Sequence, residues 1–361
     1  MCSDSWFIDE EQLDQHQLEV IRNAPARQSF LVTGCAGSGK TNLAIWKAQD
    51  INDKKLGSYL LIVYTKTLRI FIEDGILNAE LDTNKVMHYK LWEHNGKPSA
   101  DYLIVDEAQD FTVSEIDELK KNAKIALILY GDPDQQIYKD FPNRENLINL
   151  KKITPIPYPG FNLIINHRLP KKIARVANQF FINAFNKNIQ LVAHCAEEGI
   201  RMPLLLEISD PADQYRRIVN QIQAERLTHV GILLPYRKDV TRAYEFLRDL
   251  DINIQVRTEN ESTMVTAEDL SFNDSTIPKL CTYHSAKGLQ FHHVFLAECS
   301  IDFPKFYPAL YVALTRTCEG LNIFYSGNLC PEIDRIDSAL FNNQVESRQT
   351  FVNKQADDLP F

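Results

Sequence analysis

The clearest chemistry in this chain belongs to residues 34–41, which read Gly-Cys-Ala-Gly-Ser-Gly-Lys-Thr and fit the pattern GxxxxGKS/T without a gap. In this pattern, backbone N–H groups turn inward around phosphate oxygens, and the following helix adds its positive dipole end. Lys40 can reach the β- and γ-phosphates of a nucleotide, and the Thr41 hydroxyl can ligate Mg²⁺. We therefore predict a site for ATP or GTP, whose phosphates are surrounded by Gly34, Ala36, Gly37, Ser38 and Gly39.

Two adjacent carboxylates, Asp106 and Glu107, give a second chemical signal. They follow the apolar run Tyr102–Val105, about 65 residues after the glycine-rich loop. Adjacent acids usually mark a solvated turn, but a strand end downstream of a phosphate loop favours catalysis. Asp106 can hold the water shell of Mg²⁺, and Glu107 can polarise the water that attacks the γ-phosphate. Gln135, which follows a further apolar run, would lie beside the γ-phosphate as a sensor.

Strands and helices must bring these residues to one edge of a sheet. Ser29–Thr33 reads as a strand before the loop and Asn42–Ala48 as a helix after it. Other apolar runs predict buried strands of a parallel type, at Tyr59–Tyr64, Asp101–Val105 and Lys124–Tyr130. Parallel sheets place ligand contacts at the carboxyl ends of their strands. The sequence therefore predicts an α/β fold with its site along that edge.

Other polar residues lie at or near predicted elements. Thr65 and Lys66 follow one apolar strand, and His88 follows a weaker one. Taken alone, His88 is more often a structural residue. An amphipathic helix over Leu13–Ile21 carries Gln17, whose amide can donate to a base and accept from it, although a surface role is the commoner one.

A proline-rich link over residues 154–160 separates this half from a second half. Phe161–Ile165 is predicted to be the first strand of the second half, and a helix should run from Pro170 to about Phe185. Further elements are predicted as strands at Val230–Leu234, Ile252–Val256, Leu280–Tyr283 and His293–Ala297, and as a helix at Asp239–Leu250. This alternation indicates a second α/β unit with a largely parallel sheet.

Composition fits a protein with about two domains. The chain has 361 residues, 44% of them hydrophobic and 24% charged. No apolar run approaches about 18 residues, and the first residues do not resemble a signal peptide. Seven scattered cysteines, an odd number, indicate reduced thiols and a cytoplasmic location. The net charge of −9 argues against indiscriminate coating of nucleic acid but allows a local basic groove.

These segments, in order, resemble the motifs of superfamily 1 helicases of the UvrD/Rep type. In the first half the similar segments are residues 34–41, 105–110 and 131–138, together with the helix around Gln17. In the second half, residues 166–168 are similar to the family's Asn-Tyr-Arg motif, and residues 282–291 match its Thr-x-His-x-x-Lys-Gly motif. Residues 310–316 match its last motif. The resemblance spans residues 13–325.

The resemblance implies two RecA-like P-loop NTPase domains that clamp ATP and Mg²⁺ between them. The predicted parts are an ATP-binding domain over 1–153, a domain with arginine fingers over 154–330, and a polar tail over 331–361. Arg168 and Arg316 would be the fingers, although either alone would more often belong to a surface salt bridge. The resemblance further implies nucleotide contacts by Gln17, which reads adenine, and by His167, Gly288 and Gln290. His167 replaces the Tyr that stacks on adenine, and Gln290 replaces a Glu that resembles a ribose contact.

The same resemblance implies a site for single-stranded DNA. Its residues would be Thr65, Lys66, His88 and Tyr138 on one domain and Thr282 and His284 on the other. The expected activity is an ssDNA-stimulated ATPase and translocase. Two alternatives are an RNA-directed motor and an ATP-dependent switch that assembles with a partner such as a nuclease.

Two short segments and the last residues bear on that choice. Only 21 residues separate Lys66 from His88, and 23 separate Val256 from Leu280, where larger relatives carry whole subdomains. A motor stripped of these insertions should unwind duplexes weakly. The chain ends in Asp-Asp-Leu-Pro-Phe, residues 357–361, which resembles the acidic tip of bacterial single-stranded-DNA-binding proteins. Such a tip would dock onto a DNA-repair protein; a solvated tail is the plainer alternative.

Overall fold

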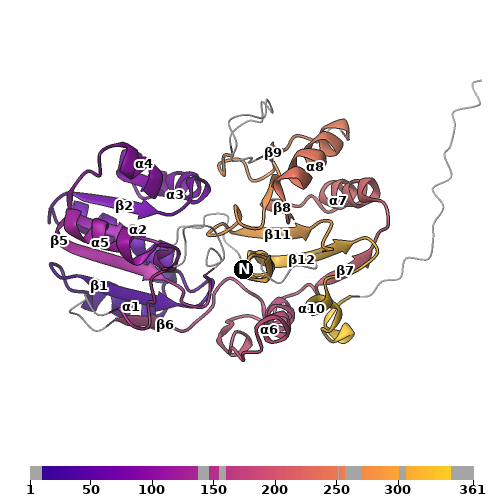
Figure 1. Cartoon of the computed structure of the whole chain (residues 1–361), viewed down its shortest axis with the longest axis horizontal. Coiled ribbons are helices and arrows are strands. Elements are labelled where there is room, and N and C mark those ends of the chain that lie inside the picture. The colour runs from indigo at the N-terminus through magenta and orange to yellow at the C-terminus, as the bar shows by residue number, and fades with distance from the viewer. Residues whose placement is uncertain are drawn as a thin grey trace, which may run out of the picture.

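The computed structural model describes residues 10–136, 146–153, 160–250, 252–256, 270–300 and 306–342. Two six-stranded sheets lie side by side, and every strand pair in both is parallel (Figure 1). The α/β class and the two RecA-like sheets predicted from the sequence are confirmed. The predicted domain limits at 153 and 330 stay a prediction.

The first sheet has the strand order β3-β2-β4-β5-β1-β6. Its strands are β1 (Phe30–Gly34), β2 (Tyr59–Val63), β3 (Val86–His88), β4 (Ala100–Val105), β5 (Ala123–Gly131) and β6 (Phe161–Leu163). Alternate side chains enter different apolar clusters: Phe30 and Val32 lie on one face, and Leu31 lies on the other. The first face is covered by α1 (Gln15–Asn23), α2 (Lys40–Asp53) and α3 (Lys66–Asn78). The second face is covered by α4 (Tyr89–His94) and α5 (Val113–Asn122).

The strand β6 corrects one prediction. Phe161–Ile165 is predicted to be the first strand of the second half, but the observed strand, Phe161–Leu163, pairs with β1 in the first sheet. Periodicity identifies a strand without naming its neighbour, and β1 would otherwise present an unpaired edge. The residues that follow β6 therefore start from the phosphate-loop side of the molecule.

The second sheet has the order β7-β12-β11-β8-β10-β9. Its strands are β7 (Leu204–Glu207), β8 (Val230–Leu234), β9 (Gln255–Val256), β10 (Lys279–Thr282), β11 (Phe291–Leu296) and β12 (Thr317–Tyr325). One face packs against α6 (Lys171–Phe185) and α9 (Tyr307–Leu314), and the other packs against α7 (Pro211–Glu225) and α8 (Arg237–Asp249). The short helix α10 (Pro331–Asp334) follows β12. Short 3-10 helices occupy Glu10–Gln12, Thr83–Lys85, Ala108–Asp110, Val192–His194 and Ser338–Leu340.

The two sheets share one continuous apolar core, to which Val63 and Leu68 contribute from the first and Leu289 from the second. Leu68, in the first turn of α3, lies so close to Gly288 that a Cβ there would be 2.7 Å from it. Gly288 also has a φ of +80°, which an L side chain rarely adopts. This close contact joins the two halves beside the cleft.

Two global expectations have structural outcomes. Five cysteines in the described ranges are free, but Cys318 is in a disulfide, so the expectation of thiols alone is wrong at that position. Spacing along the chain could not reveal this, because a disulfide depends on distance in space. In the part of the chain that the structure describes, none of the helices is long and apolar enough to span a membrane.

Candidate active site

The glycine-rich loop joins β1 to α2 and depends on two glycines with positive φ, Gly37 at +72° and Gly39 at +84°. A Cβ on Gly37 would lie 2.4 Å from the side-chain oxygen of Asn166, and one on Gly39 would lie 2.3 Å from Nε2 of Gln17. Both the backbone conformation and the space therefore require glycine. The loop can turn its N–H groups toward an anion.

Lys40 and Thr41 open α2 and point to different partners. The Lys40 ammonium donates to the carbonyls of Gly34 and Cys35, at 3.0 and 2.8 Å, so it lies folded over the loop. The Thr41 hydroxyl donates to Oδ2 of Asp106 at 2.6 Å. This pair joins the two residues expected to hold Mg²⁺. Burial, followed by the negative charge of Glu107, raises the pKa of Asp106 to about 6.

Glu107 follows β4 in a left-handed conformation, with a φ of +52°. Its carboxylate accepts a short hydrogen bond from Gln109. Burial alone would raise the pKa of this carboxyl, but three nearby cations outweigh burial and lower it. These cations are Lys287, Lys40 and Arg316. Glu107 is therefore ionised at neutral pH, as a group that orients and activates water must be.

A buried ion pair crosses between the two halves beside Glu107. The Lys287 ammonium contacts Oδ1 of Asp110 at 2.6 Å, and each side chain is only 1% exposed. It also donates to the carbonyl of Gln135 at 2.5 Å. Lys287 thus links the turn after β10 to the ends of β4 and β5.

Two arginines enter the same region from different elements. The Arg168 Nε donates to Oε1 of Gln290 at 3.1 Å, and the Arg316 Nη2 donates to Oε1 of Gln135 at 3.0 Å. The Nε of Arg316 also donates to the carbonyl of Val312 at 3.0 Å. Burial lowers the pKa of both guanidinium groups, and for Arg168 the charge of Arg316 lowers it further. Two cations held close together in a buried place favour a polyanion between them.

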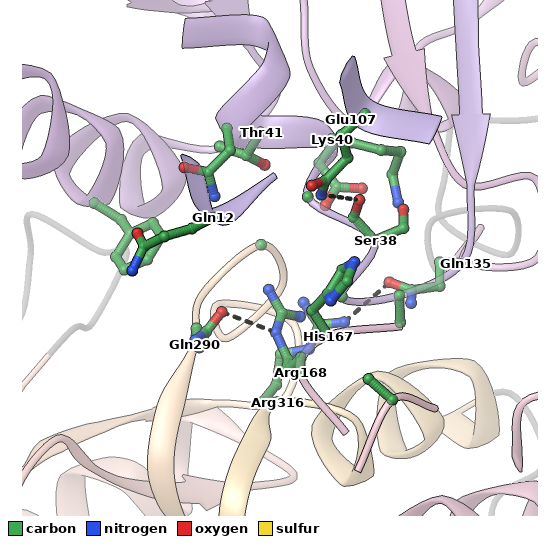
Figure 2. A pocket seen from close by; sticks show the side chains of 18 of the residues that line it. Gln12, Ser38, Lys40, Thr41, Glu107, Gln135, His167, Arg168, Gln290 and Arg316 are labelled. Carbon is green, nitrogen blue, oxygen red and sulfur yellow. Dashed lines mark hydrogen bonds between the residues drawn. The ribbon is translucent and has the colours of Figure 1, made fainter. Parts of the chain in front are cut away.

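These groups surround one cavity of about 270 Å³ (Figure 2). The predicted residues that line it are Gln17, Ala36, Gly37, Ser38, Gly39, Lys40, Thr41, Glu107, Gln135, His167, Arg168, Gly288, Gln290 and Arg316. Gly34 and Asp106 lie behind this lining, bonded to Lys40 and Thr41. The structure therefore brings the predicted nucleotide residues together, while their individual roles stay predictions.

Two buried polar atoms around the cavity have no hydrogen-bond partner, the hydroxyl of Ser38 and Nε2 of Gln135. Buried polar groups are normally paired, so unpaired donors on a cavity wall indicate a polar ligand. A triphosphate offers acceptor oxygens for these donors and for the two guanidinium groups. The residues present therefore fit a nucleoside triphosphate with Mg²⁺ at Thr41 and Asp106.

The residues expected at the base end are held by one another. The side chain of Gln17 accepts from the backbone N–H of Asp14 at 2.9 Å and donates to the carbonyl of Ser38 at 3.1 Å. Gln17 thereby caps α1 and supports the phosphate loop. The Nε2 atom of His167 lies 2.6 Å from Oδ2 of Asp14, and its backbone N–H donates to Gly37 at 2.9 Å. These contacts fix the wall on which a base would lie.

The predicted nucleic-acid residues lie outside that cavity, at or near strand ends. Thr65 accepts from the N–H of Leu68 and opens α3, while His88 accepts from the N–H of Leu91 and opens α4. Since Val63 pairs with His88, these residues share one edge of the first sheet.

The second sheet supplies the other predicted nucleic-acid residues. Thr282 ends β10, where its hydroxyl caps the turn through the N–H of Ser285. His284 follows it and contacts the ring of Phe306, with 6.0 Å between ring centroids. Burial, then Lys287 and Arg237, lowers the pKa of His284 to about 4, so the imidazole is neutral at pH 7. Tyr138 and the tip at 357–361 lie outside the described residues.

Sequence reasoning missed several residues of the cavity wall. They are Gln12, Asn42, Phe71, Ala196 and Glu197. Asn42 directly follows the glycine-rich pattern and could have been inferred from that position. Phe71 occupies the buried face of α3, a signal that indicates only a core residue. The sequence gives no signal for residues 196 and 197. The N–H of Ala196 donates to the carbonyl of Asn166, and this contact between distant parts of the chain places both residues at the cavity.

Comparison with known proteins gives a family. No curated protein matches the chain. One similar solved structure is the C-terminal domain of a possible DNA helicase from Lactobacillus plantarum WCFS1, at 16% identity and a TM-score of 0.37, covering 48% of this chain and 96% of that one. At that TM-score the similarity supports no conclusion. The model of the viral superfamily 1 RNA helicase core domain matches residues 30–229, more than half of the chain. The chain therefore belongs to the family of viral superfamily 1 RNA helicase core domains.

Proposed function

We propose that this chain is an ATPase of the UvrD/Rep type that single-stranded DNA stimulates and that moves along the strand. Membership of the helicase-core family implies an enzyme that hydrolyses nucleoside triphosphates. The observation that carries the proposal is the convergence of Arg168 and Arg316 on the cavity of the phosphate loop. A nucleotide-binding protein without hydrolysis does not need two arginines, Arg316 buried and Arg168 half-buried, on the same cavity wall as an ionised Glu107.

In this proposal the chain's own groups divide the work on the triphosphate. The loop N–H groups and Lys40 bind the β- and γ-phosphates, and Thr41 with Asp106 would hold the metal. Bound Mg²⁺ would supply charge neutralisation at the phosphate oxygens. Glu107 orients the attacking water and takes up its proton. Arg168 and Arg316 stabilise the charge that develops as the bond to the γ-phosphate breaks.

Movement along a strand would follow from opening and closing of the cleft. Thr65, Lys66 and His88 lie at or just beyond the ends of β2 and β3 in one sheet. Thr282 and His284 lie at or just beyond the end of β10 in the other. The same turn after β10 carries His284 and also Lys287, which contacts Asp110 three residues after the proposed catalytic base Glu107. A change at the triphosphate can therefore shift one set of strand contacts against the other. Alternate grip by the two sets gives directional movement.

RNA is the second candidate substrate, because the matching family is described as an RNA helicase core. The two substrates are separated by measuring ATP hydrolysis with poly-dT and with poly-U at equal nucleotide concentration. The proposal expects poly-dT to raise the rate by at least about 10-fold and poly-U to raise it much less. Stronger stimulation by poly-U would replace DNA by RNA in the proposal. Equal rates with and without either polymer would refute coupling to a strand.

A further inference from the structure

Each of the two cavity arginines is held by the amide oxygen of a glutamine. Arg168 donates from Nε to Gln290 at 3.1 Å, and Arg316 donates from Nη2 to Gln135 at 3.0 Å (Figure 2). Both bonds cross the cleft. Gln290 lies between β10 and β11 of the second sheet, whereas Arg168 follows β6 of the first.

The backbone of Arg168 is fixed independently of that bond. Its N–H donates to the side-chain oxygen of Asn166 at 3.0 Å, and the neighbouring His167 N–H donates to Gly37 at 2.9 Å. Asn166 is itself fully buried. The start of the Arg168 side chain is therefore anchored to the phosphate loop, and Gln290 sets the direction of the guanidinium.

The charge of Arg168 is left uncompensated at short range. Among the described residues, no carboxylate lies within 4.0 Å of the Arg168 or the Arg316 guanidinium. An amide oxygen positions a guanidinium without neutralising it, whereas a carboxylate at the same place would form a strong charge-assisted pair. Such a pair would have to break before the arginine could bind a phosphate oxygen.

We propose that Gln290 is a positioning residue for Arg168, which it directs at the γ-phosphate while leaving its charge available. This inference rests on the proposed function of the cavity. It differs from the ribose contact that the family resemblance implies at this position, because it makes Gln290 act on the triphosphate through Arg168. Gln290 can do this because its side chain is neutral.

The test measures affinity for ADP and for the non-hydrolysable triphosphate AMP-PNP, with Mg²⁺ and without nucleic acid. Gln290→Glu should weaken AMP-PNP binding by about 10-fold or more and change ADP binding less than about twofold. In an Arg168→Ala background the same substitution should have no further effect on AMP-PNP. Gln12→Glu is the matched control, since it adds one negative charge to the same cavity wall. Its effect on AMP-PNP affinity should be the same with or without Arg168.

A ribose role gives a different pattern. Gln290→Ala would then weaken ADP and AMP-PNP equally, and the loss would vanish with 3′-deoxy nucleotides. That result overturns the inference, as does Gln290→Glu with unchanged AMP-PNP affinity. If circular dichroism shows that Gln290→Glu is unfolded, Gln290→Ala is tested instead, with Arg168 present and with Arg168→Ala. The inference then requires that Gln290→Ala changes AMP-PNP affinity only when Arg168 is present. Failure of the wild-type chain to bind either nucleotide would refute the proposed function instead.

Discussion

Asp106 and Glu107 are adjacent carboxylates whose surroundings push their pKa values in opposite directions. Burial and the charge of Glu107 raise the pKa of Asp106 to about 6, whereas Lys287, Lys40 and Arg316 lower that of Glu107. A pair separated in this way marks different chemical roles. In the proposed function, Glu107 would stay ionised to act on water, and the Asp106 carboxylate would be stabilised by a bound cation.

Replacing Asp106 by Asn should stabilise the free protein at high pH. The folded-state pKa of Asp106 lies above its ordinary value of 3.8. The stability that the protonated carboxyl of Asp106 contributes to the folded state is therefore fully present below pH 3.8 and is lost as pH rises through about 6. Asn carries no such cost. Without Mg²⁺ and nucleotide, we expect Asp106→Asn to gain on the order of 1–3 kcal/mol at pH 8, and less at pH 5. Thermal melts at both pH values measure this; a variant that melts below the wild type at pH 8 would contradict the buried-charge account.

Arg316 and Lys40 should separate hydrolysis from binding. Arg316→Ala removes a group that acts on transition-state charge, so turnover should fall on the order of 10³-fold while ATP binding stays near the wild-type level. Lys40→Ala removes a phosphate ligand and should weaken binding as well. The measurements are steady-state ATPase rates with ssDNA and equilibrium binding of AMP-PNP. Normal ATP hydrolysis by Arg316→Ala would exclude a catalytic site in which the second half supplies an arginine to a nucleotide bound by the first half.

The sequence predicts residues well where a motif is contiguous. The loop at residues 34–41 and the pair Asp106 and Glu107 are each specified by neighbours in the chain, and each lies at the predicted strand end. It does not predict which distant side chains meet. The hydrogen bond between Arg168 and Gln290 joins residues 122 positions apart, and its form depends on Gln290 being neutral. Such contacts depend on how two sheets pack, which no local pattern encodes.

Among the elements, the strongly apolar strands were predictable, whereas the edge strand β7 was not. The runs at β2, β4, β5 and β8 are buried on both faces, so their sequences are almost continuously apolar. The strand β7 has the sequence Leu-Leu-Leu-Glu, but it is half-exposed at an edge and was missed. Edge strands obey weaker constraints because only one side pairs.

The ion pair between Lys287 and Asp110 tests how the turn after β10 is fixed to the first sheet. Lys287→Met leaves a carboxylate buried without its cation, so unfolding free energy should fall by about 3–5 kcal/mol. The double variant Lys287→Met with Asp110→Leu removes both charges and should recover most of that loss. Chemical denaturation of the three proteins gives the comparison. Equal stability of the single variant and the wild type would show that the pair does not hold the two halves together.

At the scale of the whole molecule, the two places where larger relatives carry subdomains contact each other. The helix α3 lies in the first place, and residues 270–278 belong to the second. Their rings Phe71 and Phe272 meet edge to face with centroids 5.1 Å apart, and Phe71 also lines the cavity. The described part of the second segment therefore packs an aromatic ring against α3. Helix and loop close the cleft directly.

This compact form predicts a motor with weak unwinding. The chain should hydrolyse ATP strongly with single strands yet separate long duplexes poorly, because only 21 residues lie between Lys66 and His88 and only 23 between Val256 and Leu280. A strand-displacement assay on tailed duplexes, with and without ATP, measures this property. Efficient and processive separation by the purified monomer would contradict the prediction.

Directional movement along a strand can be measured by pre-steady-state translocation kinetics. The chain is mixed with ATP and a trap on oligo-dT tracks of increasing length that carry a fluorophore at one end. For a translocating chain, the time of the fluorescence peak should grow linearly with track length for one labelled end, and Glu107→Gln should show no peak. Rapid ATP hydrolysis with a signal independent of length at both ends would contradict translocation and leave an ATP-driven switch in its place.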